Sequence, residues 1–147
     1  AGTQISQESL KLAWRIFSFS DADIVIGSKR HLLSKVNYPL KRRIYSVICQ
    51  IAALIAFNLK VKDTQVGLKI YKKEILNKII PKMKTQGYAI DIEMLIAAGA
   101  CGYKRIFETP VDLSAYQFGG AVNYKAVFQV ARDMLRTYFR LLRGYYG

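Results

Sequence analysis

The chain has 147 residues, 52% of them hydrophobic and 22% charged, which suits one folded domain and excludes general disorder. Its 23 Lys and Arg against 10 Asp and Glu give a net charge of +13. Such an excess attracts polyanions, namely nucleic acid, anionic lipid headgroups or phosphorylated substrates. The cysteines, Cys49 and Cys101, lie in apolar stretches typical of buried thiols, and no Cys/His cluster has the spacing of a metal site.

The first elements are a helix and a strand. Apolar residues at helical spacing predict a helix over 5–19, with Ser6 as its N-cap. The β-branched run 24–26 predicts a buried strand that ends in Gly27 and Ser28. A glycine at this place would let the backbone approach a phosphate.

Residues 29–43 are basic and irregular. Beyond them the pattern predicts a helix over 40–59, a strand over 66–71, helices over 73–80 and 90–100, and a strand over 104–111. The apolar part of the helix predicted over 40–59 is shorter than the roughly 20 residues of a membrane span. The fold class is therefore α/β, with a sheet of about three strands covered by helices. Three strands make a small sheet, which indicates that the sheet is incomplete.

The segment 119–147 contains a two-sided helix over 122–143. Five basic residues share one face by their spacing: Lys125, Arg132, Arg136, Arg140 and Arg143. A basic amphipathic helix with terminal tyrosines suits a membrane interface. The alternative is a helix that packs on its own domain and shows its arginines to water.

Three polar clusters flank the predicted strand ends, where open α/β sheets bind ligands. The first is 27–30, in which Lys29 and Arg30 could neutralise a phosphate. The second is 41–43, where Arg42 and Ser46 are one turn apart near a helix N-terminus. The third is the polar turn 63–69. Together they predict a site for anions.

Several motifs then occur in a familiar order: DIVIGSKR (23–30), RRIYS (42–46), DTQVGLK (63–69), GYAIDIE (87–93), GYK (102–104) and ETPV (108–111). This series resembles the second half of family 2 glycosyltransferases with the GT-A fold. It is most similar to dolichyl-phosphate mannose and glucose synthases and their bacterial polyprenyl-phosphate relatives. The resemblance covers roughly residues 5–113.

The resemblance implies that 1–118 is the acceptor-side half of an incomplete GT-A (Rossmann-like) sheet. It assigns catalytic positions to Asp63 and Gln65, and lipid-phosphate binding to Lys29, Arg30, Arg42, Ser46 and Lys69. Glu93 matches an acidic position that supports the neighbouring loop. Because Lys29 precedes Arg30 where relatives have arginine directly after serine, the phosphate-binding residue of that loop stays open between the two.

The implied reaction transfers mannose or glucose from GDP-mannose or UDP-glucose to dolichyl or polyprenyl phosphate. A phosphate monoester is already an anionic nucleophile, so it needs alignment and charge neutralisation more than a strong base. The complete enzyme should use Mg²⁺ or Mn²⁺ and work at the cytoplasmic face of a membrane, peripheral or anchored. An anionic membrane surface is the expected partner, and nucleic acid is not.

The family's donor pocket and DxD metal motif precede the helix that corresponds to 5–19. Asp21-Ala22-Asp23 has the DxD pattern but leads directly into a strand. We therefore interpret the two aspartates as ordinary polar residues at a strand start and assign no metal site in this chain. We expect the chain alone to be inactive and to need a missing amino-terminal half or subunit. The alternative function is a non-catalytic basic module that binds anionic membrane or nucleic acid.

Overall fold

A computed structural model describes residues 5–36, 61–64, 66–113 and 124–147. The elements are α1 (Gln7–Phe19), β1 (Ile24–Ser28), β2 (Lys69–Tyr71), α3 (Lys73–Ile79), the 3-10 turns η1 (Ile80–Lys82) and η2 (Gly87–Ala89), α4 (Ile90–Ala100), β3 (Ile106–Pro110) and α5 (Tyr124–Leu142). The predicted α/β class is confirmed, and the helix predicted over 40–59 lies outside the described residues. No described helix is both long enough and apolar enough to span a bilayer.

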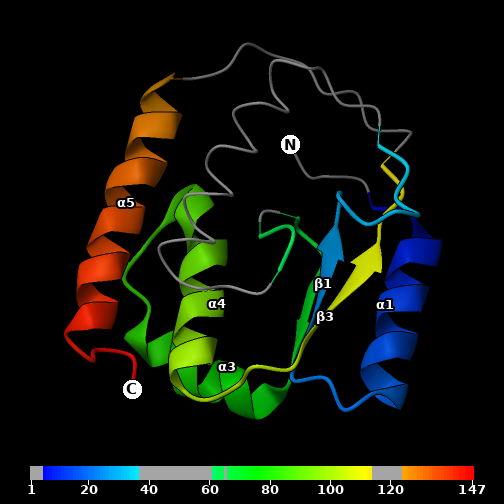
Figure 1. The fold of residues 1–147 in the computed structure, drawn as a ribbon, viewed down its shortest axis with the longest axis horizontal. Helices are drawn as coiled ribbons and strands as arrows, with labels where there is room; N and C mark the ends of the chain where they lie inside the picture. The colour runs from blue at the N-terminus through cyan, green and yellow to red at the C-terminus, as the bar shows by residue number, and fades with distance from the viewer. Residues whose placement is uncertain (1–4, 37–60, 65, 114–123) are drawn as a thin grey trace.

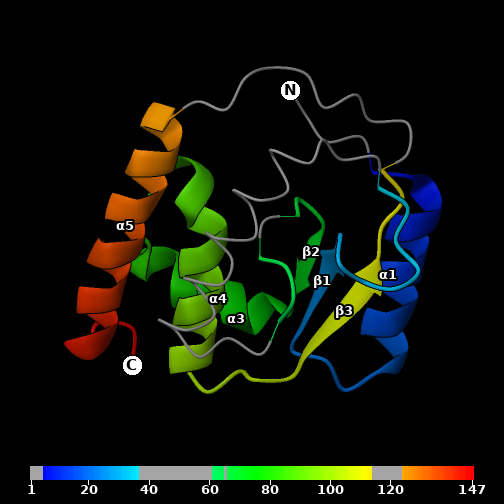
Figure 2. The same cartoon turned by 45° about the horizontal axis from the view of Figure 1, so that its top comes forward.

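The three strands form one sheet in the order β2-β1-β3. β1 is antiparallel to β2, with Ile26 opposite Lys69, and parallel to β3, with Gly27 opposite Thr109. The carboxyl ends of β1 and β3 and the beginning of β2 therefore meet at one edge of the sheet (Figure 2). The strand predicted over 66–71 pairs only from Lys69, although the Gly27 N–H still donates to the Leu68 carbonyl at 2.8 Å.

Helices cover both faces of the sheet (Figure 1). Val25 packs in a buried cluster with Ala13 of α1, whereas Ile24 and Ile26 pack in another with residues of α3 and α4. This alternation follows from the two-residue period of a strand. β1 is buried along its whole length, as its β-branched sequence predicted. α5 packs on α4 and adds Val130 and Met134 to the cluster of Ile24 and Ile26.

The ends of the helices follow local rules. The predicted N-cap Ser6 is confirmed, because its hydroxyl accepts from the Ser9 N–H at 3.2 Å. α4 ends before Gly102, whose φ of 93° is the left-handed conformation that glycine adopts most easily. Short connections then lead from α1 to β1 and from α4 to β3.

Gly27 is required by packing within the core. A Cβ atom at this position would lie 2.7 Å from Val111 Cγ1 and 3.0 Å from Val66 Cγ1. Any side chain would therefore push apart the segments on either side of β1. The sequence interpretation of Gly27 as an opening for a phosphate is wrong, because two valines already fill the space beside its Cα.

Candidate functional site

Charged and polar side chains from five segments gather at the edge where β1 and β3 end and β2 begins. β1 contributes Ser28 and the residue after it, Lys29, while β3 contributes Thr109. Lys69 is the first residue of β2, and Asp63 precedes that strand on the segment 61–64. The first turn of α4 adds Asp91. The sequence prediction of polar groups at strand ends is thus confirmed for the described part of this edge.

Asp63 holds the loop that follows β1. It is 3% exposed, and its Oδ2 accepts from the Lys29 backbone N–H at 3.1 Å and lies 3.4 Å from Lys29 Nζ. Its own segment is fixed to β3, because Glu108 Oε1 accepts from the Lys62 N–H at 2.6 Å and from the Asp63 N–H at 3.2 Å. A buried carboxylate bound in this way positions the Lys29 backbone and neutralises the Lys29 side chain.

Lys69 forms a second ion pair beside the first. Its ammonium group lies 3.0 Å from Asp91 Oδ1 and donates to the Val66 carbonyl at 2.5 Å, and its side chain is 7% exposed. Burial lowers the pKa of Lys69 below its ordinary value, and the neighbouring Asp91 opposes this shift without cancelling it. In this arrangement Lys69 is bound to the protein and is not open to a ligand.

Among the described residues, three buried hydroxyl groups have no hydrogen-bond partner: Ser28 Oγ and Thr109 Oγ1 at this edge, and Oη of Tyr71, the β2 residue opposite Ile24. Buried hydroxyls are normally bonded, so such groups point to a missing partner such as a ligand, ion or water. Burial raises the pKa of the Tyr71 phenol well above its ordinary value, and the charge of Asp91 adds to the effect. Tyr71 is therefore a neutral group that can donate a hydrogen bond.

The structure brings together three of the seven predicted site residues, Lys29, Asp63 and Lys69. Arg30 follows Lys29 and is partly exposed, and within the described part of the chain its guanidinium has no hydrogen bond or ion pair. Gln65, Arg42 and Ser46 lie outside the described residues. Asp91 and Glu108 were not predicted as partners at this edge, although they lie inside the motifs GYAIDIE (87–93) and ETPV (108–111).

Asp21 and Asp23 are engaged in ion pairs. Asp23 Oδ1 lies 3.0 Å from Lys72 Nζ and 2.9 Å from an Arg105 Nη atom, and Arg105 also binds Asp21. The Arg105 hydrogen bonds hold the pKa of Asp23 well below its usual range, helped by Lys72 and opposed by burial. Asp23 thus joins β1 to the segments before α3 and β3, at the opposite end of β1 from Ser28.

Glu93 lies away from this edge and binds α5 to α4. It is fully buried, and its carboxylate accepts from Tyr146 Oη at 2.5 Å, from an Arg140 Nη atom at 2.9 Å and from the Thr85 N–H at 2.7 Å. The Lys84 N–H adds bonds of 3.2 and 3.3 Å. The implied loop-supporting role of Glu93 agrees with the bonds to Lys84 and Thr85. Its other partners are Arg140 of α5 and Tyr146, which follows that helix.

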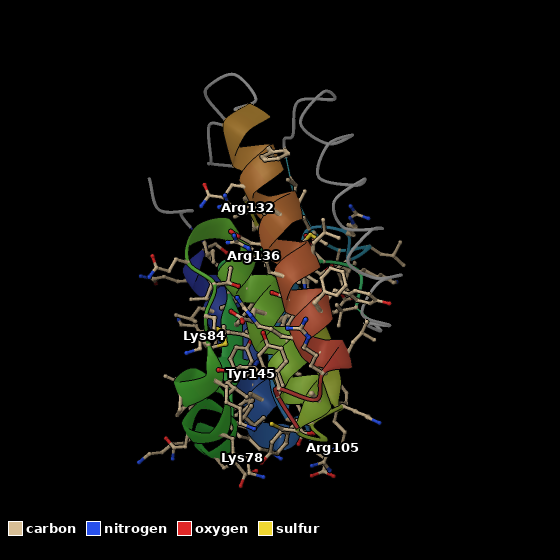
Figure 3. All side chains as sticks on the ribbon, turned by 90° about the vertical axis from the view of Figure 1, so that its left-hand side faces the viewer. Lys78, Lys84, Arg105, Arg132, Arg136 and Tyr145 are labelled. Atoms are coloured by element: carbon tan, nitrogen blue, oxygen red, sulfur yellow. The ribbon has the colours of Figure 1, made fainter. Side chains whose placement is uncertain are left out.

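The arginines of α5 do not share one environment. Arg140 turns inward to Glu93, so the prediction of five basic residues on one outer face is wrong for that position. Arg132 and Arg136 are exposed on the same flank of α5 (Figure 3). Helical spacing alone could not show the difference, because the domain approaches α5 from the side of Arg140.

α5 also exposes large apolar side chains. Its buried face includes Val130, Met134 and Thr137. Four other residues, spaced so that they form one stripe along the helix, are 56% to 72% exposed: Phe128, Leu135, Phe139 and Leu142. The helix therefore packs on its domain, as one of the two sequence alternatives expected, and still presents an apolar outer stripe beside exposed arginines.

Two proteins named dolichyl-phosphate beta-glucosyltransferase are similar to the chain. The protein of Dictyostelium discoideum is 27% identical over 128 residues, which cover 85% of this chain and 39% of that protein. The protein of Saccharomyces cerevisiae is 26% identical over 128 residues, covering 84% of this chain and 37% of that protein. No family model and no solved structure matches. The chain thus spans less than two-fifths of the length of these relatives and is similar to one part of a dolichyl-phosphate glucosyltransferase.

Proposed function

We propose that this chain forms the acceptor side of a glycosyltransferase. The complete enzyme would transfer a hexose, mannose or glucose, from GDP-mannose or UDP-glucose to dolichyl or another polyprenyl phosphate. The observation that carries the proposal is the loop at the end of β1, where Asp63 neutralises Lys29 and leaves Arg30 as an unpaired, partly exposed cation among the described residues. The similarity to two dolichyl-phosphate glucosyltransferases supports the same assignment.

We assign different roles to the predicted site residues. Arg30 would bind the acceptor phosphate, since a guanidinium offers several donors to phosphate oxygens. Asp63 would act as a positioning residue for Lys29 and the loop, in place of the catalytic role that the resemblance assigned to it. The ion pair between Lys69 and Asp91 would hold β2 and α4 together at the same edge of the sheet. Arg42 and Ser46 keep their proposed role in phosphate binding, and Gln65 keeps its proposed catalytic position.

The described residues do not fit a divalent cation. They contain no group of three or more His, Cys, Asp or Glu side chains that could hold one, and Asp63 and Asp91 are each paired with a lysine. Asp23 is bound by Lys72 and Arg105. The Mg²⁺ or Mn²⁺ of the complete enzyme is thus a proposal that needs ligands from outside the described part of this chain.

A hybrid protein tests the proposed reaction. It joins this chain to the amino-terminal part of the Saccharomyces cerevisiae relative, up to the point where the two sequences begin to align. Labelled hexose that becomes extractable with dolichyl phosphate would support the proposal.

We further propose that the protein works at the cytoplasmic face of a membrane, with segment 119–147 as a point of attachment. The support is the outer surface of α5, which combines the apolar stripe with exposed arginines, the composition of an interfacial helix. Removing the whole segment would be a poor test, because Glu93 would lose Arg140 and Tyr146. Substitutions confined to the stripe leave those contacts intact.

Replacing the four stripe residues with serine should remove most binding to vesicles of phosphatidylcholine and phosphatidylserine. The physical reason is the loss of the apolar surface that enters the interface, while the arginines still attract the anionic lipid. Flotation measures the bound fraction. Gln129→Ser, an exposed change on the same helix, is the control. Unchanged flotation of the fourfold variant would remove α5 as an attachment point.

The second candidate is a basic module without catalysis, favoured by the +13 charge and by the exposed arginine flank of α5. Binding to RNA or DNA with a steep dependence on salt, and none to vesicles, would favour it over the transferase.

A further inference from the structure

The loop after β1 exposes two consecutive leucines beside the proposed phosphate-binding residue. Leu32 is 95% exposed and Leu33 is 74% exposed, and both follow Arg30 within three residues. Single exposed leucines are common on protein surfaces and need no explanation. An adjacent pair of exposed leucines next to a cation is less common. Whether the pair indicates a binding surface depends on whether the loop could change conformation and bury the two side chains.

The loop is held too firmly to withdraw them. The His31 N–H donates to the Ser28 carbonyl at 3.3 Å, and the Ser34 N–H donates to the His31 carbonyl at 3.0 Å. The Ser34 hydroxyl donates to the Ser28 carbonyl at 2.6 Å and accepts from the Val111 N–H at 3.0 Å. Both sides of the leucine pair are therefore tied to the ends of β1 and β3.

The backbone after the pair is fixed as well. The Lys35 N–H donates to the Val111 carbonyl at 3.1 Å, and the Leu113 N–H donates to the Lys35 carbonyl at 2.8 Å. The Leu33 N–H itself donates to His31 Nδ1 at 3.3 Å. The structure thus presents the two leucines as a fixed apolar tip at the end of a short, well-bonded turn.

We propose that Leu32 and Leu33 bind the hydrocarbon of the acceptor lipid next to its phosphate, which makes them specificity residues for a phosphorylated isoprenoid. The inference rests on the proposed function, since it takes Arg30 as the phosphate ligand. In a polyprenyl phosphate the hydrocarbon begins at the ester oxygen, with no glycerol or headgroup between them. Leu32 is two residues from Arg30, so their Cα atoms are at most about 7 Å apart, a distance suited to the first isoprene units.

The apolar stripe of α5 is a separate surface. α5 and the end of β1 lie on different sides of the molecule in Figure 1, with α4 next to α5 and α1 on the side of β3. Contact between α5 and a bilayer would therefore leave the leucine pair unexplained. Because Arg30 is adjacent, the hydrocarbon of the acceptor lipid is the group that we expect to contact the leucine pair.

The test compares farnesyl phosphate, an isoprenoid phosphate monoester, with methyl phosphate, which has the same head and almost no hydrocarbon. Calorimetric titration of the whole chain, below the aggregation concentration of farnesyl phosphate, should show farnesyl phosphate binding about tenfold more tightly, the factor expected for burial of about 60 Å² of apolar surface. The double variant Leu32→Ser, Leu33→Ser should reduce that preference to about twofold or less and leave methyl phosphate binding unchanged.

The control is Phe19→Ser. Phe19 is 89% exposed and ends α1, at the end of the sheet away from the carboxyl end of β1 (Figure 1). This variant should retain the preference for farnesyl phosphate. The substitutions at Leu32 and Leu33 change exposed side chains, so the double variant should stay folded, which circular dichroism checks.

A double variant that keeps the full preference would overturn the inference, and so would one that loses methyl phosphate and farnesyl phosphate equally. Binding to phosphatidylcholine vesicles without any phosphate monoester is measured in parallel. If the double variant lost vesicle binding to the same extent as it lost the preference for farnesyl phosphate, the leucines would be bilayer contacts, and their proposed role in binding the acceptor would be overturned. If the unaltered chain binds neither phosphate, the acceptor site of the proposed function fails. If it binds both equally, only the role of the leucines fails.

Discussion

Glu93→Ala should lower the free energy of unfolding by about 3–5 kcal/mol, because the change removes one partner of a buried ion pair and leaves the other without compensation. Arg140 would lose its carboxylate, Tyr146 would lose the acceptor for its buried hydroxyl, and the Lys84 and Thr85 N–H groups would lose theirs. These groups belong to α5, to the C-terminal residues and to the loop before η2. Denaturation with urea, followed by circular dichroism, measures the loss.

Glu74→Ala is the control, since Glu74 is exposed in the first turn of α3 and should cost less than about 1 kcal/mol. The pH dependence gives an independent check. Burial tends to raise the pKa of Glu93, but the hydrogen bonds from Tyr146, Thr85 and Lys84 outweigh it and keep the pKa below its ordinary value. A carboxyl with a lowered pKa stabilises the fold above its unfolded pKa and loses this effect as the pH falls. The wild type should therefore lose more stability in acid than Glu93→Ala, and identical profiles would contradict the account.

Arg30→Ala should raise the KM for dolichyl phosphate by about 10- to 100-fold in the hybrid enzyme, the range expected for loss of a charged hydrogen bond. The KM for the nucleotide sugar should change by less than about threefold, because the proposed contact is with the acceptor alone. Initial rates of transfer at varied acceptor and varied donor separate the two effects.

Lys35→Ala is the matched control for Arg30. Lys35 lies on the same turn, is exposed, and contributes to the turn through its backbone bonds with Val111 and Leu113. Both variants remove one positive charge, so a general electrostatic effect of the loop would appear in both. An equal rise in KM for the two variants, or an equal rise for donor and acceptor in Arg30→Ala, would remove the assigned role of Arg30.

Much of the fold was predictable because its signals are local. The β-branched run before Gly27 predicted β1, and helical spacing with the Ser6 cap predicted α1. The start of β2 was placed too early because Val66 and Leu68 are buried beside β1 without belonging to the paired strand. A pattern of apolar residues reports burial, whereas strand ends depend on pairing with a neighbour.

The candidate site was predictable in its residue types and not in its pairings. Lys29, Asp63 and Lys69 were expected at one edge, but that Asp63 neutralises Lys29 and Asp91 neutralises Lys69 depends on packing between distant segments. The same limit explains Arg140, which helical spacing grouped with the outer arginines although it binds the buried Glu93. In each case the partner comes from another element.

The most direct measurement of the central claim is the transfer of labelled glucose or mannose from its nucleotide to dolichyl phosphate by the hybrid enzyme, with the unaltered Saccharomyces cerevisiae relative as the positive control. The account predicts lipid-linked sugar from the hybrid, far less from the hybrid with Arg30→Ala, and none from the chain alone. A folded hybrid that makes no lipid-linked sugar, or transfer by the chain without the amino-terminal part, would contradict it.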